Sequence, residues 1–531
     1  MASTPDLLHP VGVEHADYLR DESRKVGRAD ALAMPRDEAE LCASLRAAAA
    51  RGLSVTIQGA RTGIVAGAVP DGGVVLNLQR MNRATGLRRD ETGNYFVTVQ
   101  PGMALIDLRR MLVERHFDTA EWDAASCDAL LAMRAGGNFF LPPDPTETSA
   151  SIGGMIACNA SGACSFLYGA MRGYVTALRV ALSDGDMLDL RRGRERARQR
   201  SFQVITIGGR VIRGDLPAYD PVMIKNAAGY FAAANMELID LFVGAEGTLG
   251  VITSAELRLI PTPAEIWGVM AFLPTLDEAL RFVRGVRGDP ANGLPAIHAR
   301  PAAIELFDQH AIALLRRQKM ENTAFAHLPD LPGDLHTAIY VEYHGRCENT
   351  VADAVAAMAD CLLACGGRED ATWTATEPYE LERFKLFRHA IPEAVNLTID
   401  ARRKMVPGLT KLGTDMAVPD DRLDDVMRMY VRDLDAAGLE YVMFGHIGNN
   451  HVHVNILPHT QADYEAGRRL YMGWAGQVVR WGGTISAEHG VGKLKAELLL
   501  AMYGEEGIAQ MRAVKHCLDP GGLLNKGNLF A

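Results

Sequence analysis

Directly after a short alternating strand at residues 53–57, the chain reads Gln58-Gly59-Ala60-Arg61-Thr62-Gly63-Ile64-Val65-Ala66-Gly67-Ala68. Small side chains let successive backbone N–H groups turn toward one anion, so a loop of this kind can form a nest for a phosphate. The pattern is neither the GxGxxG that opens a dinucleotide-binding helix nor a Walker loop. Taken alone, it indicates a phosphate nest no more strongly than an ordinary glycine-rich turn.

Two more stretches of small residues lie further along the chain. One runs Pro142-Pro143-Asp144-Pro145 and then Ser151-Ile152-Gly153-Gly154-Met155-Ile156-Ala157-Cys158-Asn159-Ala160-Ser161-Gly162, which predicts two loops around a short apolar helix. The other runs Gly244-Ala245-Glu246-Gly247-Thr248-Leu249-Gly250-Val251-Ile252-Thr253. Each stretch alone is also compatible with tight packing and no ligand.

The bulk composition excludes several classes of protein. With 531 residues the chain is too long for one ordinary core, so two or three domains are expected. Its net charge of -10 gives no reason to expect a nucleic-acid partner. There is no apolar run long enough to span a membrane, and Met1-Ala2-Ser3-Thr4-Pro5 lacks the basic start of a secretory signal. The eight cysteines show no zinc-ribbon or cluster spacing, which favours a reduced, cytoplasmic protein, with peripheral attachment at the inner membrane as an alternative.

The periodicity of apolar residues predicts an α+β fold in two large parts. An N-terminal segment (1–33) precedes a domain over 34–262, and the prolines at 261 and 263 mark its end. A second α+β domain with an antiparallel sheet is expected over 263–515, followed by a closing segment over 516–531. Its strands are expected at 339–343, 440–446 and 452–457, and its helices at 276–287, 348–365, 420–437 and 463–481.

The most informative stretch for chemistry is Gly445-His446-Ile447-Gly448-Asn449-Asn450-His451-Val452-His453-Val454-Asn455. A two-residue turn at Asn449 and Asn450 would make a hairpin in which His446 lies opposite His453. Opposed residues have Cβ atoms roughly 4.5–5.5 Å apart, which suits two imidazoles that share a divalent metal. The alternative is a pair of ordinary histidines in a sheet.

A carboxylate and an imidazole stand side by side near the end of the chain. The stretch reads Ser486-Ala487-Glu488-His489-Gly490-Val491-Gly492-Lys493. If Glu488 joins His446 and His453, the set is two histidines and one carboxylate, with open positions for substrate oxygens. The alternative is a glutamate at a helix start beside an incidental histidine.

The three small-residue loops, in this order and spacing, resemble the FAD-binding domain of the vanillyl-alcohol oxidase / p-cresol methylhydroxylase superfamily. The resemblance implies a two-subdomain FAD-binding domain followed by a substrate (cap) domain. Thr62 stands where covalent members carry histidine, which implies non-covalent FAD. Arg61 would then lie over the pyrophosphate or point to solvent. The implied cofactor-binding residues are Gln58, Gly59, Ala60, Arg61, Thr62, Gly63, Gly67, Pro143, Asp144, Gly153, Gly154, Ala157, Asn159, Gly162, Glu246, Gly250, Ile252 and Asn525.

The histidine stretch, the Glu488–His489 pair and the tail from Asp519 to Asn528 together resemble the FAD-linked oxidases that include D-lactate dehydrogenase, glycolate oxidase and D-2-hydroxyglutarate dehydrogenase. Residues 449–451 depart from the family, which more often has Asp-Gly-Asn there, and the segment 200–224 fits its pattern poorly. The resemblance implies that His446, His453 and Glu488 bind a divalent metal, zinc first, with manganese or iron as alternatives. It places His489 near the substrate hydroxyl and Arg388 on the substrate carboxylate, with Lys411 as a more loosely aligned helper.

These features together predict FAD-dependent oxidation of a small D-2-hydroxy acid to the 2-oxo acid. D-lactate is the first expectation, and glycolate and D-2-hydroxyglutarate are the alternatives. The competing interpretations are a flavin dehydrogenase or oxidase for another alcohol, an FAD subunit of a larger electron-transfer complex, and a flavin-free metal protein. The electron acceptor is open among a quinone, a cytochrome and an electron-transfer flavoprotein. The oligomeric state is also open, with a homodimer as one alternative.

Overall fold

The computed structural model describes residues 7–289, 294, 297–326, 328–331, 333 and 336–530. The start Met1-Ala2-Ser3-Thr4-Pro5, on which the expectation about a secretory signal depends, lies outside them. The described chain forms two compact units. Unit 1 comprises residues 1–162, 170–262 and 488–531, and unit 2 comprises residues 163–169 and 263–487.

Unit 1 contains a small, mostly parallel sheet that carries the first loop. Its strand order is β1 (His9–Pro10), β2 (Ala31–Ala33), β4 (Val74–Asn77) and β3 (Val55–Gln58). Helix α1 (Glu38–Ala50) begins at Asp37, whose side chain accepts a hydrogen bond from the Glu40 N–H. The helix buries Leu41 and Leu45 in one core with Val74 and Leu76 of the sheet.

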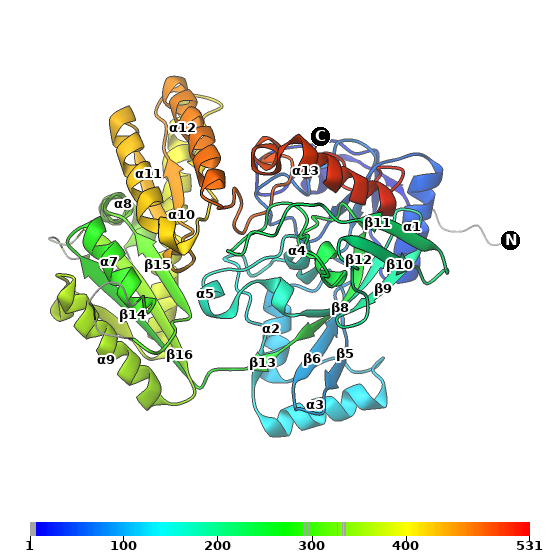
Figure 1. The fold of residues 1–531 in the computed structure, drawn as a ribbon, viewed down its shortest axis with the longest axis horizontal. Helices are drawn as coiled ribbons and strands as arrows, with labels where there is room; N and C mark the ends of the chain where they lie inside the picture. Colours follow the sequence, from blue (N-terminus) through cyan, green and yellow to red (C-terminus); the bar gives the residue numbers. More distant parts are fainter. Residues whose placement is uncertain are drawn as a thin grey trace. The chain divides into compact units, whose positions relative to one another are not determined.

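A second, antiparallel sheet of unit 1 carries the third loop. Its order is β5 (Ala84–Arg89), β6 (Tyr95–Val99), β12 (Val251–Arg258), β8 (Val175–Ala181) and β9 (Met187–Arg191). The remaining helices are α2 (Leu105–Glu114), α3 (Ala124–Gly136), α4 (Ile152–Ala157), α6 (Ile239–Phe242) and α13 (Ala496–Leu518). The remaining strands pair as β7 (Phe139–Phe140) with β13 (Ile260–Pro261) and β10 (Ser201–Ile205) with β11 (Val211–Asp215). The poorly fitting segment 200–224 thus contains a hairpin, and α13 runs beside its second strand (Figure 1).

Unit 2 is built on one antiparallel sheet of seven strands. The order is β17 (Trp373–Ala375), β14 (Glu265–Leu273), β16 (Thr337–Gly345), β15 (Ala303–Phe307), β19 (Tyr441–Gly445), β20 (His453–Ile456) and β18 (Leu412–Gly413). Every neighbouring pair is antiparallel, as the sequence predicted for this domain.

Helices pack on this sheet in pairs. Helix α7 (Leu276–Val286) packs with α9 (Glu348–Ala364), and α8 (Gln309–Glu321) packs with α10 (Pro378–Met405), each pair against β14 and β16 or their neighbours (Figure 1). Met270 and Phe272 of β14 belong to the core with α8 and α10. Since successive strand residues point to opposite faces, Val269 and Ala271 are buried on the other face. Helices α11 (Leu423–Ala437) and α12 (Gln461–Arg480) and the short α5 (Ser165–Tyr168) complete the unit.

The expected substrate domain over 263–515 ends earlier in the structure, at Ala487. The reason lies in the contacts of α13, which belong to unit 1. Tyr503 donates a hydrogen bond from its hydroxyl to the Ala228 carbonyl at 3.1 Å, and Lys515 donates to the Thr248 carbonyl at 2.8 Å. Apolar periodicity predicts a helix here, but it carries no information on which core the helix joins.

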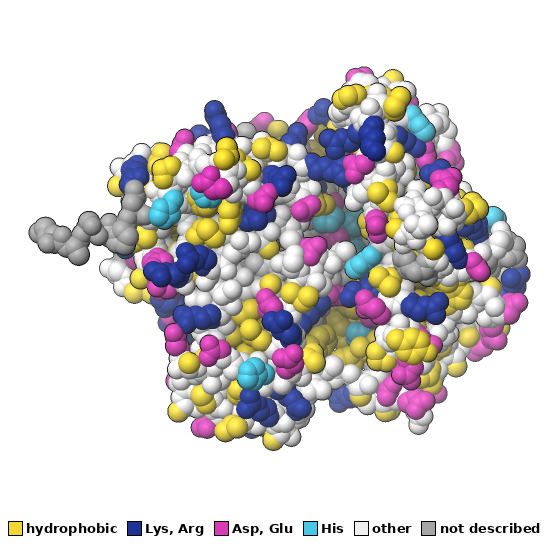
Figure 2. Space-filling view, turned by 180° about the vertical axis from the view of Figure 1, so that it is seen from behind, with side chains coloured by type: hydrophobic (Ala, Val, Ile, Leu, Met, Phe, Trp, Pro, Cys, Tyr) yellow, Lys and Arg dark blue, Asp and Glu magenta, His cyan; other side chains and the backbone are white. Residues whose placement is uncertain are grey.

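The surface mixes charges of both signs. On the face in Figure 2, Lys and Arg side chains alternate with Asp and Glu side chains over the described residues. No described helix combines the length and the apolar character that a bilayer crossing requires.

Candidate functional site

The first loop starts where β3 ends in unit 1, and buried side chains close its base. Gln58 Nε2 donates to the carbonyls of Tyr18 and Ala68, both at 2.7 Å. Gly59 packs on the start of α4, since a Cβ at this position would lie 2.0 Å from Ser151 Oγ. The loop and the helix can approach this closely only because residue 59 has no side chain.

Arg61 occupies the left-handed region of the backbone, at φ 62°. Its guanidinium carbon lies 4.8 Å from the centre of the Tyr18 ring. Its Nη1 is buried and has no hydrogen-bond partner among the described residues. A buried cationic donor of this kind needs an acceptor, and the oxygens of a phosphate supply one. The first loop therefore fits an anionic group.

The second loop closes on itself around α4. The Asp144 N–H donates to the Ser161 carbonyl at 2.7 Å, and a Cβ on Gly162 would lie 1.8 Å from the Asp144 carbonyl oxygen. The Asp144 carboxylate pairs with Arg109 at 2.8 Å. The predicted residues Gly153, Gly154 and Ala157 belong to α4 itself, and Pro143 and Asn159 flank this closed loop.

The third loop joins the other two through the end of the chain. The Glu246 N–H donates to the carbonyl of Ala157, the last residue of α4, at 2.9 Å. Asn525 accepts from the Ile57 N–H at 2.7 Å and donates to the Glu246 carbonyl at 2.6 Å. Unit 1 thus brings together all three predicted loops and the predicted C-terminal residue.

The Glu246 carboxylate is buried in this arrangement. It accepts hydrogen bonds from the N–H groups of Val491 at 2.6 Å and Gly492 at 2.7 Å. Burial raises its pKa to about 7 in spite of these hydrogen bonds. The remaining predicted cofactor residues lie on the same loops or on β12: Ala60, Thr62, Gly63, Gly67, Gly250 and Ile252.

In unit 2 the predicted hairpin around the histidines differs from the structure. The strand register pairs His453 with Phe444, so His446 does not lie opposite His453 as the sequence predicted. The correction has a local cause. Residues Ile447–Asn449 form a 3-10 turn, and Asn450 adopts the left-handed conformation, so a loop and not a two-residue turn joins β19 to β20.

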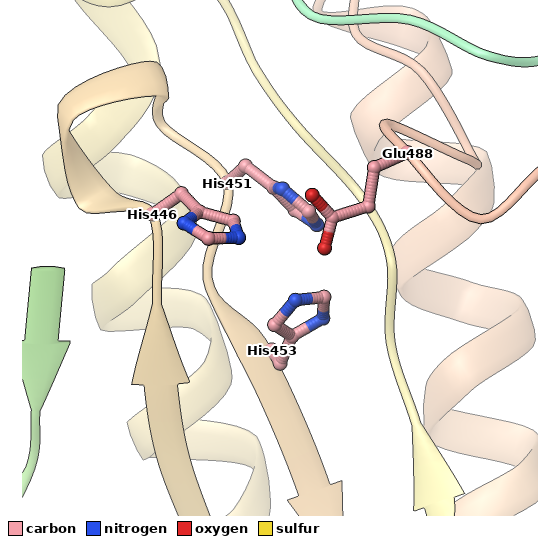
Figure 3. Close-up of side chains that lie close together, drawn as sticks. All are labelled: His446, His451, His453 and Glu488. Atoms are coloured by element: carbon pink, nitrogen blue, oxygen red, sulfur yellow. The ribbon is translucent and has the colours of Figure 1, made fainter. Parts of the chain in front are cut away.

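The loop nevertheless brings three imidazoles together. The ring centres of His446 and His453 lie 5.9 Å apart, those of His446 and His451 5.5 Å, and those of His451 and His453 4.4 Å. Figure 3 shows these rings turned toward one another, and it also labels Glu488, the first residue after the unit 2 segment. One nitrogen of each ring lies within 4.8 Å of a nitrogen of each of the other two rings. Such a set of imidazole nitrogens fits a divalent metal.

Each of the three rings also has an acceptor beside one of its nitrogens. His453 Nδ1 bonds to the Thr414 carbonyl at 2.9 Å. His446 Nδ1 lies 3.0 Å from the Glu305 carboxylate, and His451 Nε2 lies 3.0 Å from that of Asp415. Acceptors in this position fix the ring orientation of metal-binding histidines.

Arg388, the predicted carboxylate-binding residue, lies on α10 in an internal ion pair. Its Nε and Nη2 both donate to Glu305, the latter at 2.9 Å. Burial alone would raise the pKa of Glu305, but Arg388 and His446 hold it at about 2. Sequence reasoning missed Glu305, since it stands on β15, 83 positions from Arg388. Lys411 directly precedes β18, the strand that pairs with the His453 strand.

The Glu488–His489 pair lies in the segment that returns to unit 1. His489 Nε2 is 3.5 Å from Glu488 Oε1. The other oxygen of Glu488 pairs at 2.6 Å with Lys225, whose side chain is almost fully buried. Lys225 was not predicted, and the only signal for it is a lone cation in a stretch of small and apolar residues after position 220.

Two family models match the chain. The model described as FAD linked oxidases, C-terminal domain, matches residues 262–529, and the model described as FAD binding domain matches residues 29–139 and 125–191. Together they cover the first two predicted loops, the histidine stretch and Asn525, while the third loop over 244–253 lies between the two matches.

Several curated proteins are similar along nearly their whole length. Glycolate oxidase subunit GlcD of Bacillus subtilis is 28% identical over 94% of this chain and 89% of its own length. D-2-hydroxyglutarate dehydrogenase of Xanthomonas citri is 28% identical over 98% and 93%. D-lactate dehydrogenase of Archaeoglobus fulgidus is 27% identical over 93% and 90%.

Solved structures agree on the fold. 4-Ethylphenol oxidase from Gulosibacter chungangensis superposes with a TM-score of 0.63 at 17% identity, over 99% of this chain and 94% of that one. At this identity the likeness concerns the fold alone.

Proposed function

Because this chain belongs to the family of FAD-linked oxidases, we propose that it oxidises a small D-2-hydroxy acid to the 2-oxo acid with the help of a divalent metal. At the level of class, it is an FAD-dependent oxidoreductase that acts on hydroxy acids. D-lactate is the first substrate to test, then glycolate and D-2-hydroxyglutarate. The observation that carries the metal-dependent part is the convergence of imidazoles in unit 2.

The three loops of unit 1 are the proposed holders of FAD. When bound, FAD accepts the hydride from the substrate carbon. Thr62 offers no imidazole for a covalent link, so we propose non-covalent binding. Arg61, with its buried Nη1, would meet the pyrophosphate, and the small residues of the loop would offer their N–H groups beside it.

His446, His453 and Glu488 are the proposed metal ligands, with zinc as the first candidate and manganese or iron as alternatives. A cation held by these residues would lower the pKa of the substrate hydroxyl and help to orient the acid. Glu488 follows Ala487, whose N–H donates to the Asp415 carbonyl of unit 2 at 2.7 Å. This anchor supports the choice of Glu488, because its neighbour Ala487 is bonded to the segment that follows β18, the strand that pairs with the His453 strand.

The remaining proposed roles belong to three side chains. His489 would take the hydroxyl proton, since an imidazole nitrogen can accept a proton and this side chain is about one-third exposed. Arg388 and Lys411 would attract the substrate carboxylate. Glu305 engages Nε and Nη2 of Arg388, so Nη1 is the edge proposed to face the acid.

The test is anaerobic bleaching of the visible flavin band by a panel of D- and L-2-hydroxy acids, with and without a chelator. We expect rapid bleaching by one D-acid, its loss after chelation and its return with added metal. His489→Ala should slow the bleaching, whereas His516→Ala, a change in α13 outside the proposed site, should not. A yellow protein that no acid bleaches would contradict the substrate class. Bleaching that resists chelation would contradict the metal and favour oxidation of another alcohol by the flavin.

A further inference from the structure

His451 is a third imidazole in the unit 2 cluster, and the two-histidine ligand set leaves it without a role. Its side chain is fully buried. It stands between the two predicted ligands in the sequence, so the cluster holds one more nitrogen donor than the predicted ligand set uses.

The backbone places His451 as firmly as the two predicted ligands. The His446 carbonyl accepts from the N–H groups of Asn449 at 2.9 Å and His451 at 3.2 Å, which closes the loop onto its own first histidine. Asn450 Nδ2 donates to the Val418 carbonyl at 3.1 Å, so the loop is also tied to the segment after β18. Hydrogen bonds on both sides of His451 therefore fix its backbone, and burial of its side chain limits how far the ring can turn.

A buried carboxylate lies beside one nitrogen of the His451 ring. Asp415 lies 3.0 Å from its Nε2, and Ser486 Oγ donates to the other oxygen of that carboxylate at 2.7 Å. Asp415 is 1% exposed, so solvent does not compete for it. Glu305 does the same for His446, and the Thr414 carbonyl for His453. Three rings of one cluster, each with its own acceptor, form a repeated arrangement that a lone core histidine does not need.

We infer that His451 is a third histidine ligand of the divalent cation, oriented by Asp415. This inference rests on the proposed metal-dependent function. Ligand nitrogens about 2.1 Å from zinc lie roughly 3–3.5 Å from one another. The nitrogens here lie within 4.8 Å of one another, so ring shifts on the order of 1 Å suffice. A set rich in imidazole selects zinc, iron, copper or nickel over manganese and magnesium, which prefer oxygen donors.

The test compares metal binding in full-length His451→Asn, His446→Asn and His453→Asn with that of the wild-type protein, all with FAD bound. Zinc affinity is measured by competition with a chromophoric chelator, and the number of imidazole ligands by X-ray absorption at the zinc edge. His459→Asn is the matched control, since His459 is exposed and pairs with Glu440 outside the cluster. Asp415→Asn removes the negative charge beside the ring and keeps the shape of the side chain.

We expect His451→Asn to weaken zinc binding more than about 100-fold, Asp415→Asn about 10–100-fold, and the control not at all. The number of imidazole ligands fitted to the X-ray absorption spectrum should be one lower in His451→Asn than in the wild type. The preference of the protein for zinc over manganese should also fall. Loss of metal in His446→Asn and His453→Asn but not in His451→Asn would overturn this inference and leave the proposed function intact. A wild-type protein that binds no zinc would overturn both. If His451→Asn does not fold, the wild-type spectrum decides: a fit by no more than two imidazoles contradicts the third ligand.

Discussion

Gly162 is the residue on which the second loop of unit 1 depends most directly. Its φ is +110°, and a Cβ there would lie 1.8 Å from the Asp144 carbonyl oxygen. Gly162→Ala therefore forces the backbone of the loop apart and adds strain on the order of 1–3 kcal/mol. We expect FAD affinity to fall by about tenfold or more, measured as flavin fluorescence released on dilution.

Gly173→Ala is the control for this change. A Cβ on Gly173 meets no atom within 4 Å, and the residue lies outside the predicted loops. The Gly173→Ala variant should bind FAD as tightly as the wild type. Equal loss of flavin in both variants would show that the effect is general destabilisation and not the closure of the loop.

For single residues, the sequence predicts which side chains take part in a site better than it predicts which side chains contact one another. The spacing of His446 and His453 predicted a shared site, and their rings do lie close, although the expected register was wrong. The contact of Arg388 with Glu305 and that of Lys225 with Glu488 join residues 83 and 263 positions apart. No local pattern encodes such pairs, because the fold alone brings them together.

Helix α8 of unit 2 carries a titratable group at its start. Asp308 is the N-cap and accepts from the Ala311 N–H at 2.8 Å, while its Oδ2 is buried with no hydrogen-bond partner among the described residues. Burial raises its pKa to about 7. In the unfolded chain an aspartate titrates near 3.9. Between about pH 4 and 7 the folded state therefore binds more protons, and stability falls as the pH rises.

We expect Asp308→Asn to flatten this part of the stability profile. The wild-type free energy of unfolding should drop by up to about 1.4 kcal/mol per pH unit across that window relative to the variant. Denaturant titrations at pH 4.5, 6 and 7.5 measure the difference. Asp123→Asn, the same change at the exposed N-cap of α3, should leave this window unaltered. Parallel profiles for wild type and Asp308→Asn would contradict the raised pKa.

Helices and strands in which apolar residues recur at a regular spacing were predicted well. The expected helices at 276–287 and 348–365 correspond to α7 and α9, and the expected strand at 339–343 lies within β16. Helix α10 was not predicted, although it is 28 residues long. Pro392 interrupts its pattern, and proline in a helix interior normally ends the helix, so the local signal argued against a continuous element. Packing of its apolar side chains in the α8–α10 core overrides that preference.

At the scale of the whole molecule, the chain enters unit 2 briefly over residues 163–169, leaves unit 1 again after Thr262 and returns to it at Glu488. The crossing after Thr262 was predicted from two prolines, which mark a linker by their fixed backbone. The sequence predicted the return to unit 1 only at residue 516, which is too late. Residues 487 and 488 stand in a stretch rich in small residues, and no change of composition marks a boundary there. The consequence is that unit 1 is complete only when the last part of the chain is in place.

Asn525 tests this closure. Its side chain bonds the Ile57 N–H at 2.7 Å and the Glu246 carbonyl at 2.6 Å, and its own N–H donates to the Val55 carbonyl at 2.8 Å. Asn525→Ala leaves the first two groups unpaired in the interior, at a cost of about 2–6 kcal/mol. Calorimetry measures the effect, and added FAD or added zinc identifies each unfolding transition by raising its temperature. In the FAD-free variant we expect a lower unfolding temperature for the FAD-sensitive transition and little change in the zinc-sensitive one. Asn94→Ala, a change in an exposed turn held by Asp90, is the control and should alter neither transition beyond a small shift. An FAD-free variant as stable as the wild type would mean that Asn525 contributes only to the flavin, since a segment that closes the unit must stabilise it with or without the cofactor.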